Sequence, residues 1–334
     1  MTDTVFRQLV LKCGRPDIFF TEFTSTDGLF SKGRERVIHR LKFDKREGPI
    51  VAQIWGKNPE NYWKAAQLLA EFGFDGIDIN MGCPVEKIVK SGNCSALIEN
   101  PSLVSELIRA TREGAPQLPL SVKTRLGFSS LNTEEWCGFL LNQDIHALTV
   151  HGRIAKHLSK YRVKWEEIQK VVQLRDSLKR DIVVVGNGDV KSLSEVDEKV
   201  RTFGVDGVMM GRAIFENLYL FSRDSIPLSE RSVSEKLSLL LEHIDLFEST
   251  WGETKPFRIL KKFFKNYITN FWGASELRAS AIECETSQEV KDLLQKFLLE
   301  YSSRELDSRP GTLMNDDKES DGKLGGKRVE ILSL

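Results

Sequence analysis

Short β-rich runs alternate with amphipathic, helix-like stretches through the first two-thirds of the chain. The apolar runs predict strands at residues 18–23, 50–55, 76–80, 120–125, 147–151, 182–186 and 207–210. Helices are predicted between them at residues 59–72, 100–114, 133–142, 165–174 and 193–203. An opening helix is predicted at residues 2–13, with Thr2 or Asp3 as its cap. Strands that alternate with helices imply a parallel sheet built through crossover connections.

The number of predicted strands fits a (β/α)8 TIM barrel without its first strand, or a doubly wound open sheet. Polar residues and glycines follow several different strand ends, at residues 80–83, 151–153, 187–189 and 211–212. In a barrel all these ends surround one mouth, whereas an open sheet uses only its switch point. We therefore predict a barrel over residues 1–225. Its first strand is expected to be missing, which leaves two free sheet edges.

After about residue 225 the pattern changes to helices only. They are predicted at residues 233–247, 255–271, 275–282 and 287–301. We interpret residues 226–302 as a small all-α domain. Residues 303–334 are polar and rich in Gly, Asp and Lys, which is typical of a flexible tail.

The charges cancel, since 48 Lys and Arg balance 48 Asp and Glu. This excludes a chain that is basic everywhere but not a local basic surface. Three stretches are basic: residues 32–46, residues 153–164, which include Lys156, and residues 251–272. In the last, one helix face carries Arg258, Lys261, Lys262 and Lys265. Each stretch is either a solvated surface or a phosphate-binding one.

The cysteines and apolar runs indicate the compartment. Five cysteines are scattered without a C-x-x-C pair, which favours a reducing environment over disulfides or a zinc site. The apolar runs are far shorter than the roughly 18 residues of a spanning helix. The first residues also lack the layout of a signal peptide. We expect a cytoplasmic protein without metal or membrane association.

The segment DINMGCP at residues 78–84 carries the sharpest chemical signal. A strand ends there, and Gly82 and Pro84 favour a turn that would present Cys83 at the barrel mouth. The alternative is a small cysteine buried in a tight turn. Cys94 is a second candidate thiol, but nothing in its sequence setting demands reactivity.

The last two predicted strands end in glycine-rich segments. Asn187, Gly188 and Asp189 follow one strand, and Gly211 and Arg212 follow the next. Barrel loops at these positions often bind phosphate through backbone N–H groups, and an arginine would add a charged fork. Ordinary turn chemistry is the alternative.

Three further polar residues lie within or at the end of predicted strands: Gln53, Lys123 and His151. Each alone is more often a structural residue than a ligand. Together, on inward-facing barrel strands, they favour a ligand site at the mouth.

In order and spacing, NMGCP, the preceding DGIDI, VKTRLG, VHGR, NGD and GR resemble the tRNA-dihydrouridine synthases over residues 1–225. The helical C-terminal part is also similar in size and place. The resemblance implies an FMN-dependent enzyme that uses NADPH to reduce the C5–C6 bond of uridine in the tRNA D-loop. In this family an Ala-Pro-Met strand usually precedes the opening helix, and the loop at residues 154–163 usually has another form.

The resemblance also implies roles for individual residues. Cys83 would protonate C5 while flavin N5 delivers hydride to C6, and Asn80 would hold the flipped uracil and the flavin. Gln53 and Lys123 would contact the isoalloxazine ring. The ribityl phosphate would be held by His151, Asn187, Gly188, Asp189, Gly211 and Arg212. Arg153 would face the RNA.

Three hypotheses follow. The first is a tRNA uridine reductase, expected to be a monomer, with tRNA as its partner. The second is an FMN-dependent barrel oxidoreductase of a small molecule, which leaves the helical domain and basic stretches without a role. The third is a non-catalytic tRNA-binding relic that lost flavin binding with its first strand.

Overall fold

The computed structural model describes residues 2–158 and 160–307 of the chain. Its strands are β1 Phe19–Phe20, β2 Thr24–Ser25, β3 Ile50–Trp55, β4 Gly76–Asn80, β5 Leu120–Arg125, β6 Ala147–His151, β7 Val183–Asn187 and β8 Gly207–Met209. They form one parallel sheet in the order β1-β3-β4-β5-β6-β7-β8, and β2 pairs with the later part of β3. This sequential order is that of a barrel wall.

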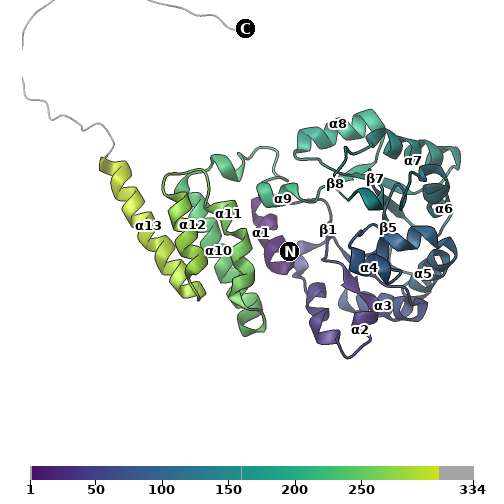
Figure 1. The fold of residues 1–334 in the computed structure, drawn as a ribbon, viewed down its shortest axis with the longest axis horizontal. Coiled ribbons are helices and arrows are strands. Elements are labelled where there is room, and N and C mark those ends of the chain that lie inside the picture. Colours follow the sequence, from purple (N-terminus) through teal and green to yellow (C-terminus); the bar gives the residue numbers. More distant parts are fainter. Residues whose placement is uncertain (1, 159, 308–334) are drawn as a thin grey trace, which may run out of the picture.

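Helices cover the outside of this sheet (Figure 1). They are α1 Thr4–Cys13, α2 Thr26–Leu29, α3 Pro59–Phe72, α4 Glu86–Lys90, α5 Pro101–Gly114, α6 Gly138–Leu141, α7 Trp165–Ser177, α8 Leu193–Phe203 and α9 Ala213–Glu216. The predicted helix at residues 133–142 is a π-helical turn, Thr133–Cys137, followed by α6. The bounds of α3 match the prediction because Asn58 caps its start and Gly73, at φ 80°, ends it.

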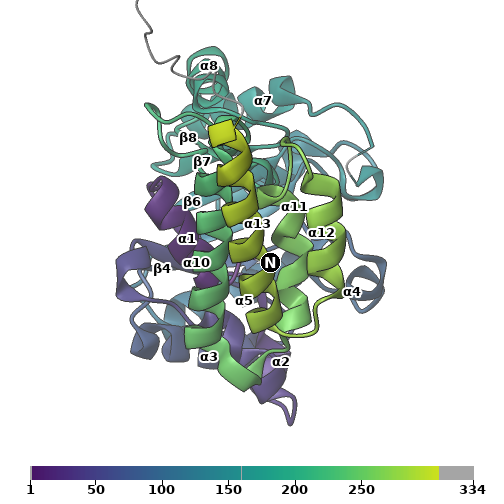
Figure 2. The ribbon, with the colours of Figure 1, turned by 90° about the vertical axis from the view of Figure 1, so that its left-hand side faces the viewer.

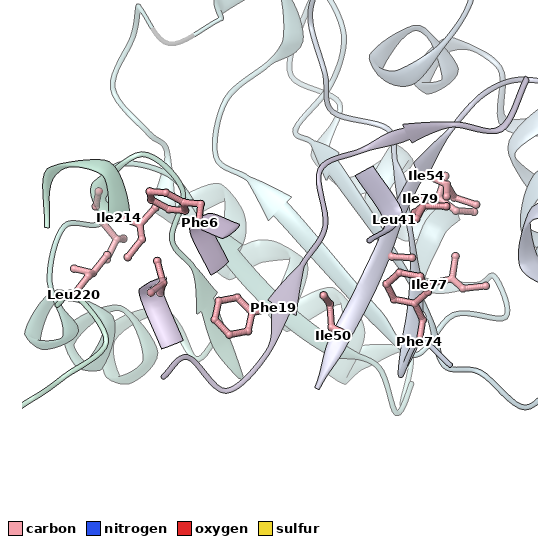
Figure 3. Close-up of a cluster of buried hydrophobic side chains, with 14 of the residues drawn as sticks. Phe6, Phe19, Leu41, Ile50, Ile54, Phe74, Ile77, Ile79, Ile214 and Leu220 are labelled. Carbon is pink, nitrogen blue, oxygen red and sulfur yellow. The ribbon is translucent and has the colours of Figure 1, made fainter. Parts of the chain in front are cut away.

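The sheet is open between its two outer strands. Within residues 2–158 and 160–307, no strand pairs with the free edge of β1 or of β8. The predicted fold, a TIM-barrel type without its first strand, is confirmed. Apolar side chains gather near this opening, with Phe6 of α1 close to Ile214 of α9 and Phe19 of β1 farther along (Figure 3). The ring centroids of Phe6 and Phe215 lie 5.1 Å apart, so α1 and α9 pack directly.

The C-terminal region is helical, as predicted. Its helices α10 Val233–Trp251, α11 Phe264–Tyr267, α12 Ala274–Glu283 and α13 Ser287–Asp307 form a bundle (Figure 2). The prediction of one continuous helix at residues 255–271 was wrong. A 3-10 helix at Phe257–Phe263 precedes the short α11, and this break lets Leu260, Phe263, Phe264 and Tyr267 all be buried.

Helix α13 extends to Asp307, so the first part of the predicted tail is helical. The rest of that prediction lies outside the described residues.

Helix α1 joins the bundle to the barrel. It packs on α10, and Lys12 forms an ion pair with Glu242. The cap residue Asp3 accepts hydrogen bonds from Trp251 Nε1 at 2.9 Å and from Lys255 Nζ at 3.0 Å. The start of α1 therefore contacts the end of α10, which fixes one side of the bundle against the barrel.

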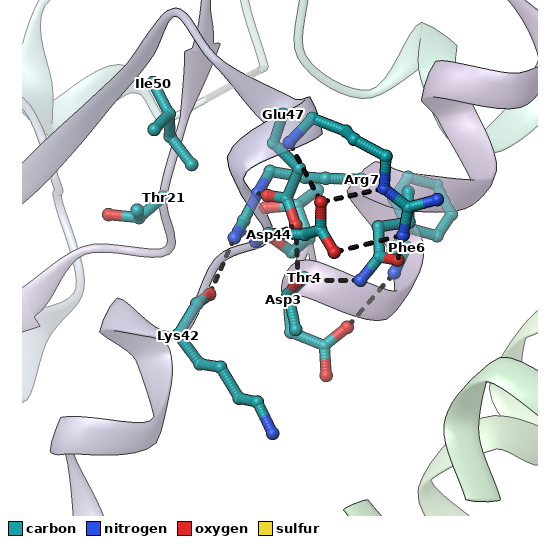
Figure 4. A network of polar contacts seen from close by, with 12 residues as sticks. Asp3, Thr4, Phe6, Arg7, Thr21, Lys42, Asp44, Glu47 and Ile50 are labelled. Carbon is teal, nitrogen blue, oxygen red and sulfur yellow. Dashed lines mark hydrogen bonds and ion pairs between the residues drawn. The ribbon is translucent and has the colours of Figure 1, made fainter. Parts of the chain in front are cut away.

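A buried ion pair anchors the same helix to the loop before β3 (Figure 4). Arg7 Nε donates to Glu47 Oε2 at 2.5 Å, and both side chains are almost fully buried. Arg7 also donates to the carbonyl oxygens of Thr2 and Lys42, at 2.7 and 2.9 Å. The remaining polar atoms are thus satisfied, which a buried ion pair requires.

Candidate active site

Polar side chains of three adjacent strands meet inside the sheet. The register pairs Gln53 with Asp78 and Asn80 with Lys123. Gln53 Nε2 donates to Asp78 Oδ2 at 2.7 Å, and Asn80 Nδ2 donates to Gln53 Oε1 at 2.9 Å. Each amide is therefore held in one orientation by its neighbour.

Asp78 is the buried end of this network, and it was not among the predicted site residues. It is 0% exposed and also accepts from Ser121 Oγ at 2.6 Å. Burial raises the pKa of Asp78 to about 6, against the effect of the hydrogen bonds from Ser121 and Gln53. The only sequence signal was a charged residue inside a run that otherwise predicts a buried strand.

Asn80 shapes the turn that carries Cys83. Its Oδ1 accepts from the backbone N–H groups of Gly82 and Cys83, at 3.1 and 3.0 Å. Cys83 is half-buried and lies directly after β4, in the turn that the sequence predicted. Arg125, which was not predicted as a site residue, also holds this turn, because its Nε donates to the carbonyl oxygen of Gly82 at 2.7 Å.

The Cys83 thiol is acidic. A hydrogen bond from Cys94 lowers the pKa of Cys83 to about 6, outweighing burial, with smaller contributions from a backbone N–H and from the charges of Arg125 and Lys123. Cys94 itself is fully buried, and its pKa is raised by the same contact and by burial. Sequence spacing could not reveal this thiol pair, because the loop between the cysteines had no predictable path.

Lys123 reaches across the sheet interior. Its Nζ donates to Asn187 Oδ1 at 3.2 Å, and Asn187 Nδ2 donates to the Met209 carbonyl at 2.7 Å. Burial lowers the pKa of Lys123 to about 8, so the ammonium is still mostly charged at neutral pH. A positive charge thus lies between Asn80 and Asn187 at the carboxyl ends of the strands.

Arg153 and Asp189 pair with each other. Arg153 is only 5% exposed, so it does not face solvent as expected for an RNA contact. It forms an ion pair with Asp189, which also accepts from Arg212 Nη2 at 2.9 Å. Asp189 therefore orients two arginines, and as a carboxylate it offers no donor to an anion.

His151 and the two glycines lie beside these arginines. Arg153 Nη1 donates to His151 Nε2 at 3.3 Å, and burial together with nearby cations lowers the pKa of His151 to about 2. The imidazole is therefore neutral, with its proton on Nδ1. Gly188, at φ 135°, takes a backbone conformation that favours glycine, and a Cβ there would lie 2.8 Å from Val163. Above Gly211 the space is open.

Part of the basic surface forms a cleft between α9 and the helical bundle. The cleft has a volume of about 550 Å³, and Arg212, Lys262 and Lys265 line it together. Arg258 is also exposed. Lys261 is partly committed elsewhere, because its Nζ donates to the Ile282 carbonyl at 2.6 Å. Lys156 is exposed in its loop and lies over the Phe128 ring, 5.7 Å from the centroid.

Neither a metal-binding cluster nor a membrane-spanning helix is present in the described residues. In that part of the chain no three His, Cys, Asp or Glu side chains are grouped so that they could hold a metal ion. None of its helices has both the length and the apolar character needed to cross a membrane.

Comparison with known proteins identifies the family. The model of the dihydrouridine synthase family, Dus, matches residues 1–302. A probable tRNA-dihydrouridine synthase 2 of Bacillus subtilis is 42% identical over 304 residues, covering 90% of this chain and 92% of its relative. A probable tRNA-dihydrouridine synthase of Staphylococcus aureus is 40% identical over 300 residues, covering 89% of this chain and 90% of that protein. The chain belongs to the dihydrouridine synthase family.

Proposed function

We propose that this protein is a tRNA-dihydrouridine synthase, which uses FMN and NADPH to reduce the C5–C6 bond of a uridine in the tRNA D-loop. The observation that carries the proposal is the position of Cys83. An acidic thiol stands at the carboxyl end of the sheet, beside the ammonium of Lys123 and the amide of Asn80. The names of its relatives specify tRNA as the substrate.

The mouth fits a phosphorylated flavin. Arg212 has an exposed side chain, and the open space above Gly211 leaves room for an anion beside it. His151, Asn187 and the backbone at Gly188 complete this proposed phosphate site, and Asp189 acts by orienting Arg212. FMN, when bound and reduced by NADPH, supplies the hydride to uracil C6.

Lys123 and Gln53 would contact the flavin ring. The Lys123 ammonium, held by Asn187, would stabilise the negative charge of a reduced ring. Gln53 has its amide orientation fixed by Asp78 and Asn80, so it presents a defined hydrogen-bonding edge.

Cys83 would give the proton at Sγ to C5 of the uracil. Since the pKa of Cys83 is lowered to about 6, the thiolate would first have to take up this proton at neutral pH. Asn80 fixes the backbone of the Cys83 turn and would orient the base. Arg125 fixes the same turn through the Gly82 carbonyl and also donates to the Ile154 and Leu158 carbonyls, at 3.2 and 3.0 Å. One arginine thus couples the proton donor to the neighbouring loop.

The RNA would cross the basic surface beside the mouth. Lys262 and Lys265 line the cleft with Arg212, and Arg258, Lys261 and Lys156 extend the positive surface. Cationic side chains bind the RNA backbone, while one base must leave its stack to reach Cys83. We place this activity in the cytoplasm and expect a monomer.

The test is reconstitution with unmodified tRNA, FMN and NADPH, followed by mass spectrometry of the nucleosides. Dihydrouridine should form only when all three are present. The second candidate, a non-catalytic tRNA-binding protein, is favoured by the opening between β1 and β8. Salt-sensitive tRNA binding without dihydrouridine or NADPH oxidation would support that candidate. NADPH oxidation that does not depend on tRNA but increases with a free pyrimidine or an enone would instead indicate a small-molecule oxidoreductase.

A further inference from the structure

Cys83 and Cys94 lie side by side although the sequence separates them by a loop and α4. The backbone N–H of Ser95 donates to the Cys83 carbonyl at 3.4 Å, so the two backbone segments are adjacent. The two thiols are near enough for Cys94 to lower the pKa of Cys83. Backbone segments that lie side by side in this way bring two cysteines into the range in which a disulfide can form.

The backbone at Cys94 is unusual. Its φ is 53°, in the left-handed region that a residue with a side chain rarely adopts. Cys94 is 0% exposed and begins a 3-10 helix, Cys94–Glu99. A strained backbone at a buried cysteine that lies next to another cysteine is a reason to look for a function of the pair.

The two thiols differ in accessibility. Cys83 is half-buried at the mouth, where a small oxidant can reach it, whereas Cys94 is enclosed behind it. The charges of Arg125 and Lys123 favour the thiolate of Cys83. A reachable thiolate with a second thiol behind it is the arrangement of redox-sensitive cysteine pairs.

We propose that Cys83 and Cys94 form an oxidation site, which hydrogen peroxide converts into a disulfide. The Cys83 thiolate attacks one peroxide oxygen and releases hydroxide, which takes up a proton to give water. The sulfenic acid at Cys83 is then attacked by the sulfur of Cys94. The S–S bond forms as the hydroxyl leaves with the Cys94 proton as a second water. Two thiols lose two electrons and two protons, and one peroxide becomes two waters.

The proposed disulfide would protect Cys83 from further oxidation and would also prevent it from donating a proton. It stops the oxidation of Cys83 before the irreversible sulfinic acid, and it removes the proton that the proposed function assigns to Cys83. This consequence for activity rests on the proposed function, whereas the disulfide itself does not. A thiol reductant should restore both cysteines.

The test is peptide mapping of the full chain after brief exposure to hydrogen peroxide. Free thiols are blocked with N-ethylmaleimide, and trypsin then cleaves after Lys87 and Lys90, between the two cysteines. We expect a peptide pair joined through Cys83 and Cys94 that disappears with dithiothreitol. Cys284, near the end of α12 and partly exposed, should remain alkylated and unlinked.

Two variants sharpen the result. In Cys94→Ala we expect sulfinic acid at Cys83 to rise at least about tenfold, because no thiol intercepts the sulfenic acid. In Cys284→Ala the 83–94 linkage should form as in the wild type. Wild-type protein in which Cys83 becomes sulfinic, or in which both cysteines stay alkylable, without a linked peptide would overturn the proposal, even where Cys94→Ala does not fold.

The two proposals fail in different ways. A linked peptide in a protein that makes no dihydrouridine would refute the proposed function and leave the oxidation site intact. Dihydrouridine formation that peroxide abolishes without a linked peptide, and that dithiothreitol does not restore, would refute the oxidation site alone.

Discussion

Asp78 connects the buried interior of the sheet to Cys83 through three successive contacts. Its carboxylate fixes the Gln53 amide, Gln53 fixes Asn80, and Asn80 accepts from the backbone N–H of Cys83. Each group leaves its neighbour one hydrogen-bonding orientation. The position of Cys83, the proposed proton donor, therefore depends on a carboxylate that does not contact it.

We expect Asp78→Ala to lower dihydrouridine formation by about tenfold to a hundredfold, because the Gln53 amide would lose the acceptor that holds its orientation. The rate should be measured with saturating tRNA. Ser121→Ala, which removes one hydrogen bond to Asp78 and leaves the amides in place, should change the rate only a few-fold. Equal losses of rate in both variants would contradict a dependence of Cys83 on the contacts that run from Asp78 through Gln53 and Asn80.

The acidity of Cys83 gives a pH dependence. Because its pKa is lowered to about 6, the thiolate should form as pH rises through that value. Iodoacetamide alkylation of Cys83 should therefore rise through about pH 6 and level off above pH 7. Cys94→Ala should move the midpoint upward, because the hydrogen bond that stabilises the thiolate is lost. A midpoint near 9, the ordinary value of a thiol, would show that the pair does not interact.

At the scale of elements, α1 is held from two directions. Arg7 ties it to the loop before β3 through Glu47, and Asp3 ties its start to the bundle through Trp251 and Lys255. Lys255 also lies over the Trp251 ring, 3.5 Å from the centroid. The orientation of the bundle relative to the barrel mouth thus depends on the first turn of one helix.

We expect Arg7→Ala to reduce the free energy of unfolding by about 3–5 kcal/mol, because the Glu47 carboxylate would be left buried without its partner. Urea denaturation measures this loss. Arg46→Ala breaks the exposed pair with Asp44 and should cost less than about 1 kcal/mol. Similar losses in the two variants would mean that burial does not distinguish these ion pairs.

Helices whose ends are set by local caps were predicted most accurately. Residues 59–72 and 193–203 were predicted to the residue, because local caps at Asn58 and Ser192 and left-handed glycines at 73 and 204 define them. The break in residues 255–271 was not predicted, because the apolar residues Leu260, Phe264 and Ile268 recur at the spacing of a continuous helix. In the candidate site, a strand end and turn residues singled out Asn80 and Cys83, and a charge within a predicted strand singled out Lys123. The partners Asp78, Arg125 and Cys94 required the three-dimensional arrangement.

At the scale of the whole molecule, the zero net charge is a cancellation between regions. Basic residues gather beside the sheet mouth, where Arg212, Lys262 and Lys265 line one cleft between the barrel and the bundle. The phosphate site proposed for the flavin and the surface proposed for RNA therefore share an edge at Arg212. Substrate and cofactor would meet at the junction of the two parts.

We expect the double variant Lys262→Glu, Lys265→Glu to weaken tRNA binding and to reduce the salt dependence of log K by about 2, roughly one for each lost phosphate contact. Filter binding across a salt series measures both quantities. Lys170→Glu changes the charge on the outer helix α7 and should leave the slope unchanged. An equal effect of Lys170→Glu would mean that overall charge, and not the cleft, governs binding.

The most direct test of the proposed role of Cys83 is dihydrouridine formation by Cys83→Ala under single-turnover conditions. The enzyme, FMN and NADPH are in excess over unmodified tRNA. We expect product with the wild type and a rate at least about a hundredfold lower in the variant, because the proton for C5 has no donor. The tRNA affinity of the variant should be unchanged. Product formation at the wild-type rate in Cys83→Ala would show that Cys83 is not the proton donor.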